Sequence, residues 1–191
     1  LGAKLKQQPV SVYAIVGDGE VEEGECWEAF MFAAHYGLSN LCVVLDRNHL
    51  QIDGTTDTVM SSEPLEEKMK AFNFNVLTIN GHDYDQIEAA IQAFHAENDK
   101  PTCIIMDTTK GKGVSFMTNS VDWHGKGPND EEYAIAMQEL LDSQTQEAER
   151  YQPEEAERLN NAVFATYGTC VVLCVTSDTD TANAVIKEYV G

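Results

Sequence analysis

The sequence predicts an α/β fold in which a parallel sheet is covered by helices on both faces. Short apolar runs rich in β-branched residues alternate along the chain with amphipathic stretches of helical periodicity. The apolar runs are continuous, which is typical of parallel strands buried on both sides. Ligands of such sheets bind beyond the carboxyl ends of the strands.

The elements expected in the first part of the chain alternate regularly. Strands are expected at 10–16, 41–45, 75–79 and 102–106, and helices at 22–36, 64–72 and 84–96. Gly37 follows the first helix at the position where a left-handed residue commonly ends a helix. Polar residues follow three of the strands, in Gly17-Asp18-Gly19, Asp46-Arg47-Asn48 and Gly81-His82-Asp83. We expect these three clusters to lie together at the ligand edge of the sheet.

The later part of the chain has a different character. Residues 108–128 are rich in glycine and turn residues, and we expect them to form a functional loop over the sheet edge. The elements expected beyond the loop are a helix at 130–141, a charged helical stretch at 143–161, a strand at 170–175 and a helix at 179–189. We therefore expect one domain at 1–142, and a helical segment with a strand and a helix of unassigned role at 143–191.

The composition excludes several classes of function. Twelve basic and 32 acidic residues give a formal net charge of −20, which disfavours nucleic acid and anionic membrane surfaces as partners. No apolar run approaches the roughly 20 residues that span a bilayer, and no signal-peptide pattern is present. An anionic cofactor must therefore be held by backbone amides or by a metal ion.

The five cysteines indicate a reducing compartment. They are Cys26, Cys42, Cys103, Cys170 and Cys174. Their number is odd, and at least three lie in apolar runs, where a free thiol behaves as a small buried hydrophobic group. We interpret the last two as core residues of a strand and not as zinc ligands, and we expect a cytoplasmic protein.

Asp18 and Asn48 form a candidate metal site. Asp18 follows the first strand between two glycines, as a tight turn requires, and Asn48 follows the second strand 30 residues later. One carboxylate, one amide oxygen and one backbone carbonyl leave room in a Mg²⁺ octahedron for diphosphate oxygens and a water. The Gly-Asp-Gly turn alone is compatible with an ordinary loop. The asparagine at this distance favours the metal site.

Residues 12–128 resemble the N-terminal, diphosphate-binding domain of transketolases, in the form in which the two halves are separate chains. The matching stretches are GDGEVEEGECWEA at 17–29, AAHYGLSNL at 33–41, DRNHLQIDG at 46–54, KGKGVSFM at 110–117 and WHGKGPND at 123–130. The resemblance implies a thiamine-diphosphate-binding fold, thiamine diphosphate as cofactor, and Mg²⁺ or Ca²⁺ as its metal. It also implies transfer of two-carbon ketol units between sugar phosphates, as in the pentose phosphate pathway.

The resemblance assigns the cofactor-binding residues. Asp18 and Asn48 match the side chains that bind the metal, and Leu50 matches the position whose backbone carbonyl does so. Gly17 and Gly19 flank the first ligand, and Gly19 matches a diphosphate contact. Ile52 matches an apolar wall of the thiazolium pocket.

The resemblance also assigns three catalytic residues. His124 matches a loop histidine that faces the cofactor and the donor substrate, where an imidazole can exchange protons near pH 7. Glu23 and Glu28 match glutamates on a hydrogen-bonded path between two cofactors of a dimer. Both glutamates also lie at the start of a helix, where the helix dipole favours acidic residues in any case.

Other candidate residues have weaker support. Among the histidines, His35 is expected at a helix surface or interface, His49 beside the metal ligands, and His95 in solvent. His82 could reach the site or belong to a turn. The basic residues near the site are Lys110, Lys112 and Lys126, which could meet a sugar phosphate but individually fit solvated loop positions better.

The resemblance implies that this chain acts with a partner. In the family, the glutamate that activates the pyrimidine ring lies on the C-terminal, pyrimidine-binding half, so we expect that half to be the partner, in a dimer of heterodimers or a homo-oligomer. The family's domain begins upstream of Leu1, so we expect a half-built site that is inactive in the isolated chain. Trp27, Phe30 and Met31 form an apolar cluster, part of which we expect at an interface.

Two alternatives stay open from the sequence. One is a component of another thiamine diphosphate enzyme of the same architecture, of the 2-oxo-acid dehydrogenase type. The other is a non-catalytic fragment that keeps the fold. Substrate profiling of the assembled complex separates the first alternative from a transketolase, and metal-dependent cofactor binding addresses the second.

Overall fold

The chain forms two compact units. The computed structural model describes residues 1–151, 153–167, 170–176 and 178–189. The first unit comprises residues 1–111 and 119–126, and the second comprises residues 112–118 and 127–191. The expected domain boundary at residue 142 falls within a helix of the second unit and stays a prediction.

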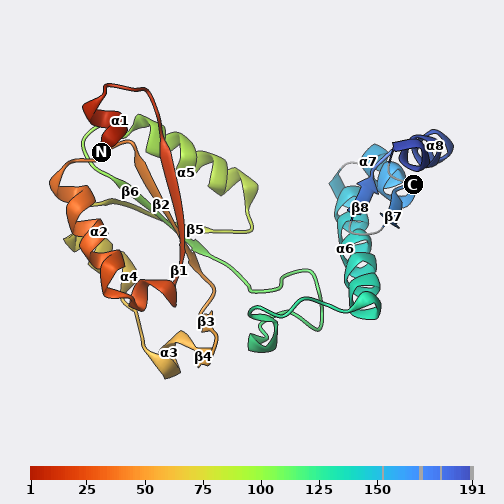
Figure 1. Ribbon diagram of the computed structural model, residues 1–191, viewed down its shortest axis with the longest axis horizontal. Coiled ribbons are helices and arrows are strands. Elements are labelled where there is room, and N and C mark those ends of the chain that lie inside the picture. The colour runs from red at the N-terminus through yellow and green to blue at the C-terminus, as the bar shows by residue number, and fades with distance from the viewer. Residues whose placement is uncertain (152, 168–169, 177, 190–191) are drawn as a thin grey trace. The chain divides into compact units, whose positions relative to one another are not determined.

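The first unit is built on a four-stranded parallel sheet (Figure 1). Its strands are β1 (Val12–Gly17), β2 (Leu41–Arg47), β5 (Asn75–Asn80) and β6 (Thr102–Asp107). They are hydrogen-bonded in the order β1-β2-β6-β5, so β2 and β6 are central. The apolar runs of the sequence therefore form the expected strands, each to within two residues of its predicted ends.

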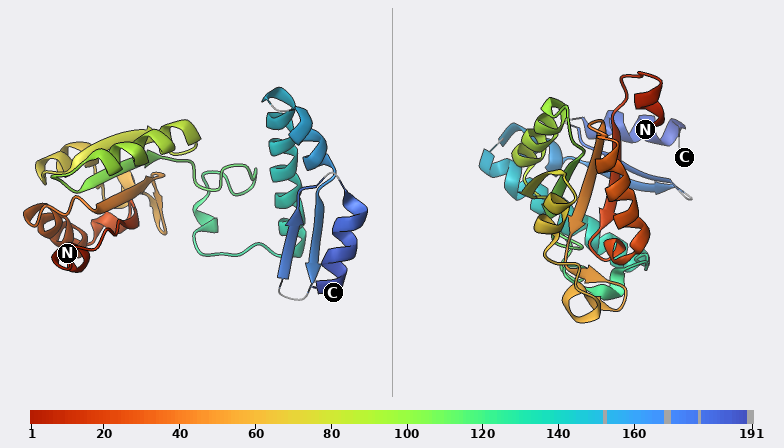
Figure 2. Two further views of the ribbon diagram at one scale, coloured as in Figure 1. Left: turned by 90° about the horizontal axis from the view of Figure 1, so that it is seen from above. Right: turned by 90° about the vertical axis from the view of Figure 1, so that its left-hand side faces the viewer.

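Helices cover both faces of this sheet, which confirms the predicted fold class. The long helices of the unit are α2 (Gly24–His35), α4 (Leu65–Ala71) and α5 (Tyr84–Ala96). In β2, Val43 and Leu45 pack in the core formed with α2 and α4, whereas Cys42 packs in the core formed with α5. Figure 2 shows α5 running along the sheet. Successive residues of one strand thus serve opposite faces, which is why the run contains no polar position.

The end of α2 confirms the role predicted for Gly37. This glycine adopts a φ of +54°, and its N–H and that of Leu38 donate to carbonyl groups of the last helical turn. Lys4, in the short helix α1 (Gly2–Leu5), donates from its ammonium to the Gly37 carbonyl oxygen at 2.6 Å. A cation therefore lies at the negative end of the α2 dipole.

Several short elements are absent from the sequence prediction. They are the 3-10 turns η1 (Glu20–Glu22) and η2 (Val121–Trp123), the strands β3 (Leu50–Gln51) and β4 (Gly54–Thr55), and the helix α3 (Thr56–Val59). Because η1 occupies the residues before Gly24, α2 begins two residues later than predicted. Elements of two to four residues carry too few positions for a periodicity to be recognised.

The outer strand β1 is less covered than the central strands. Tyr13 packs edge-on against Phe94 of α5, with ring centroids 5.4 Å apart. Ile15, two residues further along the same face, is 74% exposed. The expected burial of the sheet on both faces therefore holds for β2 and β6 but not for all of β1.

The second unit contains three helices and a two-stranded sheet in its described part. The elements are α6 (Asp130–Tyr151), α7 (Pro153–Asn160), β7 (Val163–Tyr167), β8 (Cys170–Cys174) and α8 (Thr179–Tyr189). Strands β7 and β8 pair in antiparallel register, and only β8 was expected from the sequence. Val163, Ala182 and Ile186 form a small core, against which Cys174 packs, while the side chain of Cys170 lies outside the described residues.

The segment that precedes α6 is tied to that helix within the second unit. The backbone N–H of Ser115 donates to Oε2 of Glu139 at 2.6 Å. A Cβ added to Gly113 would lie 2.8 Å from Leu140, so the backbone approaches the helix closely at this point. No helix in the described ranges combines the length and the apolar character that a membrane crossing needs.

Candidate functional site

The candidate site lies where β1 and β2 end side by side. Gly17, the last residue of β1, is in register with Asp46 of β2. The backbone N–H of Asp18 then donates to the Asp46 carbonyl oxygen at 3.0 Å, which continues the pairing beyond the strand. The parallel register therefore brings Asp18 and Asn48 to the same edge of the sheet, as the sequence predicts.

Asp18 is a buried carboxylate held by backbone donors. It is 2% exposed, its Oδ2 accepts from the His49 N–H at 2.6 Å, and its Oδ1 accepts from the Gly19 N–H at 3.0 Å. Burial raises the pKa of the Asp18 carboxyl, and these two donors oppose the rise without cancelling it. A cation bound at this carboxylate would therefore compensate a real desolvation cost.

Asn48 is oriented by its neighbours. Its Nδ2 donates to Oδ2 of Asp46 at 3.2 Å, and its Oδ1 accepts from the Leu50 N–H at 3.0 Å. Asp46 also accepts a hydrogen bond from the Thr108 hydroxyl at the end of β6. These bonds determine which atom of the amide is the oxygen, and that oxygen keeps a second lone pair for a metal ion.

His49 connects the two candidate ligands through its backbone. It adopts a φ of +62°, in the left-handed region, and this conformation aims its N–H at Asp18 directly after Asn48. His49 therefore lies beside the two candidate ligands, and its contact with Asp18 is made by the backbone. A left-handed residue that is not glycine carries a strain cost, which the bond to the buried carboxylate offsets.

The glycines of the turn have a different role from the one expected. Neither Gly17 nor Gly19 adopts a positive φ, so the turn conformation itself does not require glycine. A Cβ on Gly19 would instead lie 2.9 Å from the Cβ of Gln51, so this position needs glycine for space. A Cβ on Gly17 would have no neighbour closer than 4.0 Å.

A cavity of about 540 Å³ opens at this edge and brings most of the expected residues together. The expected residues that line it are Gly17, Asp18, Gly19, Glu23, Asn48, Leu50, Ile52 and His124. Glu28 is exposed on α2 and does not line it. Asp46, expected at this edge, and Lys110, expected near the site, also line the cavity. The lining residues that the sequence did not single out are Glu20, Glu22 and Gln51.

The cavity is strongly acidic. Five carboxylate residues line it, namely Asp18, Glu20, Glu22, Glu23 and Asp46. Lys110 is the one lysine or arginine among its described lining residues. An anionic group would meet net negative charge here, so a divalent cation is needed to bind a diphosphate.

The donor set fits such a cation. No group of three or more His, Cys, Asp or Glu side chains able to hold a metal occurs among the described residues. The edge offers instead one carboxylate from Asp18, one amide oxygen from Asn48 and the backbone near Leu50. Hard oxygens in this small number suit Mg²⁺ or Ca²⁺ when a diphosphate supplies further ligands.

The remaining histidines lie in distinct settings. His124 follows η2 and reaches the cavity wall, while the ring of His35 contacts Tyr36 at the end of α2. His82 accepts a hydrogen bond at Nε2 from the backbone of Thr109. His95, expected in solvent, is exposed but shares a 3.0 Å hydrogen bond with the Tyr13 hydroxyl.

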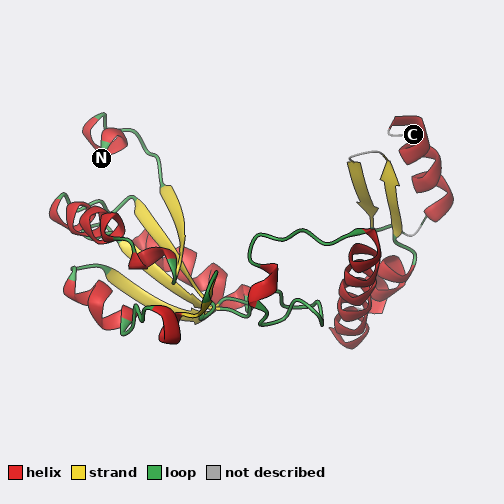
Figure 3. Cartoon of the chain, turned by 60° about the horizontal axis from the view of Figure 1, so that its bottom comes forward, coloured by secondary structure: helices red, strands yellow, loops and turns green. Residues whose placement is uncertain are grey.

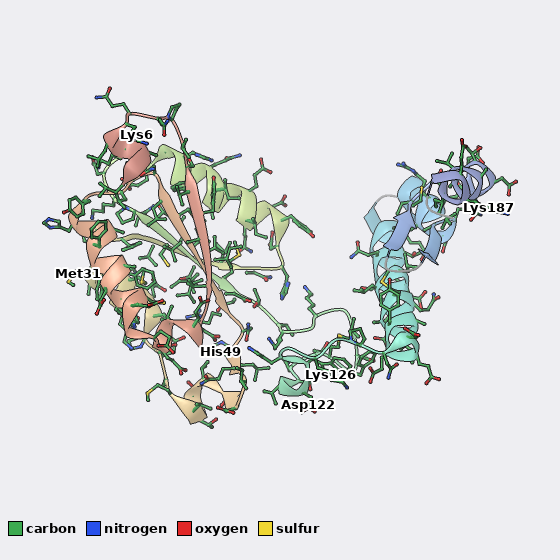
Figure 4. The ribbon with its side chains drawn as sticks, viewed as in Figure 1. Lys6, Met31, His49, Asp122, Lys126 and Lys187 are labelled. Carbon is green, nitrogen blue, oxygen red and sulfur yellow. The ribbon has the colours of Figure 1, made fainter. Side chains whose placement is uncertain are left out.

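The lysines near the site separate in the structure. Lys110 lines the cavity, against the expectation of a solvated loop position. Lys126 lies over the Trp123 ring, 4.3 Å from its centroid, in the segment that carries His124. Figure 4 labels Lys126 in the loop beyond β6. Lys112 belongs to the second unit.

A parallel α/β sheet with a carboxylate and an amide oxygen at its carboxyl edge is typical of domains that hold an anionic cofactor through a divalent cation. The family model described as "Transketolase, thiamine diphosphate binding domain" matches residues 5–168. The chain therefore belongs to the transketolase family and contains its thiamine diphosphate binding domain.

Known relatives agree with this assignment. The chain is 40% identical over 140 residues to an apulose-4-phosphate transketolase subunit of Phocaeicola vulgatus, covering 73% of this chain and 50% of that protein. It is 39% identical over 140 residues to the 6-deoxy-6-sulfo-D-fructose transketolase subunit SqwG of a Clostridium species, covering 73% and 51%. The chain thus spans about half the length of these relatives.

Solved structures agree as well. The crystal structure of transketolase from Campylobacter jejuni superimposes with a TM-score of 0.65 at 31% identity, covering 70% of this chain and 21% of that one. Transketolase from Leishmania mexicana superimposes with a TM-score of 0.55 at 26% identity, covering 77% and 25%. The parallel sheet with helices is therefore the fold of the family.

Proposed function

We propose that the chain is the diphosphate-binding component of a transketolase that transfers two-carbon ketol units between sugar phosphates. The observation that carries the proposal is the meeting of Asp18 and Asn48 in one cavity, in a chain of this family. Two relatives are named as subunits of transketolases, one for apulose 4-phosphate and one for a sulfo sugar. These names support a transketolase over a 2-oxo-acid dehydrogenase component.

Different residues of the cavity bind different parts of the cofactor. Asp18, Asn48 and the Leu50 carbonyl hold Mg²⁺ or Ca²⁺, and the turn at Gly17 and Gly19 admits the diphosphate because no side chain projects there. Ile52, which is 70% exposed, offers an apolar surface to the thiazolium ring. When bound, thiamine diphosphate would supply the carbanion-stabilising chemistry needed to break and form a carbon–carbon bond.

The protein also handles protons. His124 lies in the cavity wall, where its imidazole can hold or move a proton at a hydroxyl oxygen of the sugar. Glu23 lines the same cavity, and Glu28 lies further along α2 on an exposed position. We assign both glutamates to the route by which two cofactor sites of an assembly share protons.

The assembly involves a C-terminal, pyrimidine-binding subunit. The apolar cluster expected at an interface divides in the structure: Phe30 is 5% exposed, Trp27 is half-buried, and Met31 is 61% exposed. Figure 4 shows Met31 on the outer side of α2. Phe32 and Tyr36 are exposed on the same helix, which makes α2 the proposed contact in a dimer of heterodimers or a homo-oligomer.

The proposed setting is the cytoplasm, in sugar phosphate metabolism of the pentose phosphate type. The four described cysteines are free thiols, which supports a reducing compartment. Because the chain spans about half the length of its relatives, we expect no turnover from the isolated chain.

The test is a coupled assay of two-carbon transfer with thiamine diphosphate and Mg²⁺. The preparations are the chain alone, the chain with a pyrimidine-binding subunit, and that complex carrying His124→Ala. We expect no turnover from the chain alone. In a complex that transfers two-carbon units, we expect the substitution to lower turnover more than it weakens cofactor binding. Robust turnover from the chain alone, or a complex that accepts 2-oxo acids but no ketose phosphate, would contradict the proposal.

A further inference from the structure

We propose that His82 is a positioning residue, whose ring holds the segment that brings Lys110 and His124 to the cofactor cavity. The inference rests on the proposed function of that cavity. His82 lies in the turn between β5 and α5 and does not line the cavity itself. Its effect on the site must therefore pass through other residues.

The contact is a hydrogen bond from backbone to imidazole. The N–H of Thr109 donates to Nε2 of His82 at 2.8 Å. This contact requires a ring whose Nε2 carries a lone pair, and a neutral imidazole with its hydrogen on Nδ1 provides one. The N–H of His82 donates in turn to Oδ1 of Asn80 at 3.0 Å, which sets the backbone from which the ring projects.

The turn that carries His82 fits tightly against the end of β6. A Cβ added to Gly81 would lie 2.5 Å from Cγ2 of Thr108 and 2.9 Å from Cβ of Met106. The Gly81 N–H donates to the Asp107 carbonyl oxygen at 2.9 Å. The imidazole therefore meets Thr109 from a backbone that has little room to shift.

The segment after β6 connects this contact to the cavity in two directions. Thr108 donates from its hydroxyl to Asp46, which accepts from the Asn48 amide. Lys110 lines the cavity, and its carbonyl oxygen accepts from the Asn119 N–H at 2.9 Å. Asn119 begins the stretch 119–126 of the first unit, which contains His124.

The segment lacks regular secondary structure, as Figure 3 shows for the chain beyond β6. A residue outside helices and strands depends on individual hydrogen bonds for its position. His82 supplies the side-chain bond to Thr109, midway between the Thr108 contact to Asp46 and the Lys110 contact to Asn119. Loss of that bond should loosen the path toward Lys110 and His124.

Two substitutions test whether the hydrogen-bond acceptor of His82 or its aromatic ring is the feature that matters. His82→Gln keeps a side-chain oxygen that can accept from Thr109, whereas His82→Phe keeps a ring and removes the acceptor. His95→Phe is the matched control, because His95 is a histidine bonded to Tyr13 on another part of the unit. If His82→Phe fails to fold by circular dichroism, His82→Leu replaces it, since leucine also lacks an acceptor.

The first measurement is hydrogen exchange of peptides that cover 108–111 in the full chain without cofactor. We expect exchange to rise by about fivefold or more in His82→Phe, and to stay near the wild-type rate in His82→Gln and His95→Phe. Unchanged exchange in His82→Phe would overturn the inference, whatever the chain's activity.

The second measurement is turnover of the complex with the pyrimidine-binding subunit. We expect kcat to fall roughly tenfold in His82→Phe and to be restored to within about twofold by His82→Gln. A complex that accepts 2-oxo acids but no ketose phosphate would refute the proposed function. An active complex in which His82→Phe matches the wild type would refute the positioning role instead.

Discussion

At the scale of single residues, Asp18 is a charged side chain in a buried position, where an apolar side chain would pack at lower cost. Its carboxyl is 2% exposed, and its pKa is raised by that burial even though two backbone N–H groups donate to it. A buried carboxylate without a cation is a poor stabiliser. This side chain therefore gains most when a divalent cation is bound beside it.

Burial also governs the cysteines. It raises the pKa of the Cys42 thiol to about 11 and that of Cys103 to about 12, and both residues are 0% exposed. Because the thiolate reacts and its fraction falls tenfold per unit of raised pKa, both should resist alkylation at pH 8. Mass spectrometry after iodoacetamide treatment should find them modified only once the chain is unfolded. Labelling of Cys103 in the folded chain would contradict the burial.

The close approach of Gln51 to Gly19 leads to a prediction about stability. Gly19→Ala would place a Cβ 2.9 Å from that of Gln51, so we expect the free energy of unfolding to fall by about 1–3 kcal/mol. Gly24→Ala is the matched control, because its Cβ would meet nothing within 4 Å. We expect the control to gain about 0.4–1 kcal/mol in urea unfolding. Equal effects of the two substitutions would show that the Gly19 contact carries no cost.

At the scale of elements, the ends of β2 and β6 are joined by Arg47. Its Nε lies 2.5 Å from Oδ1 of Asp107, and its NH1 lies 3.5 Å from Oε1 of Glu63. The Arg47 side chain is 17% exposed, so these contacts are partly shielded from water. Arg47 lies between Asp46 and Asn48 in the sequence but does not line the cavity.

Removing the Arg47 side chain should destabilise the ends of β2 and β6, where the site lies. We expect Arg47→Met to lower the free energy of unfolding by about 1–2 kcal/mol, because Asp107 and Glu63 are part-exposed and recover hydration. Arg47→Lys should recover little, since one ammonium cannot reproduce the planar guanidinium contacts. Chemical unfolding measures both variants. Full stability of Arg47→Lys would show that charge alone suffices.

Elements with a strong periodicity or a cap were predictable from the sequence. The helix α5 has the predicted bounds, because Asp83 caps it by accepting from the N–H groups of Asp85 and Gln86. The apolar runs predicted the strands because strands buried on both faces, as β2 and β6 are, contain few polar residues. The ligand edge followed from the expected parallel sheet, because the carboxyl ends of parallel strands lie at one edge.

Elements defined by contacts far apart in the sequence were not predictable. The strands β3 and β4 have two residues each, and the role of Lys110 depends on where 108–111 lies relative to the cavity. Residue 19 needs to be glycine because the Cβ of Gln51, 32 positions later in the chain, lies too close for a side chain. Neither relation leaves a local pattern in the sequence.

At the scale of the whole molecule, the chain belongs to a family whose relatives include named transketolase subunits, and it spans about half their length. Its net charge of −20 opposes non-specific binding to nucleic acid and favours solubility. For the proposed partner subunit we therefore expect apolar surface to contribute to association. The exposed side chains of α2 provide such a surface.

The α2 surface makes a prediction about assembly. Met31→Lys should weaken association with the pyrimidine-binding subunit, because a charge would be buried where a 61% exposed apolar side chain now lies. Tyr84→Lys is the control, since Tyr84 is 87% exposed at the start of α5. Light scattering coupled to size exclusion measures the complex. If only Tyr84→Lys lost association, the interface would lie on α5 and not on α2.

The most direct test of the cofactor site is calorimetry of thiamine diphosphate binding to the chain, with Mg²⁺ and with a chelator. We predict that binding requires Mg²⁺ and that Asp18→Ala weakens it by more than about 100-fold. Substituting a residue that only hydrogen-bonds to a metal ligand already lowers metal affinity by about 10–100-fold. Asp99→Ala, at an exposed carboxylate on another loop, should bind as the wild type does. A folded Asp18→Ala chain that keeps wild-type, Mg²⁺-dependent affinity would contradict the account.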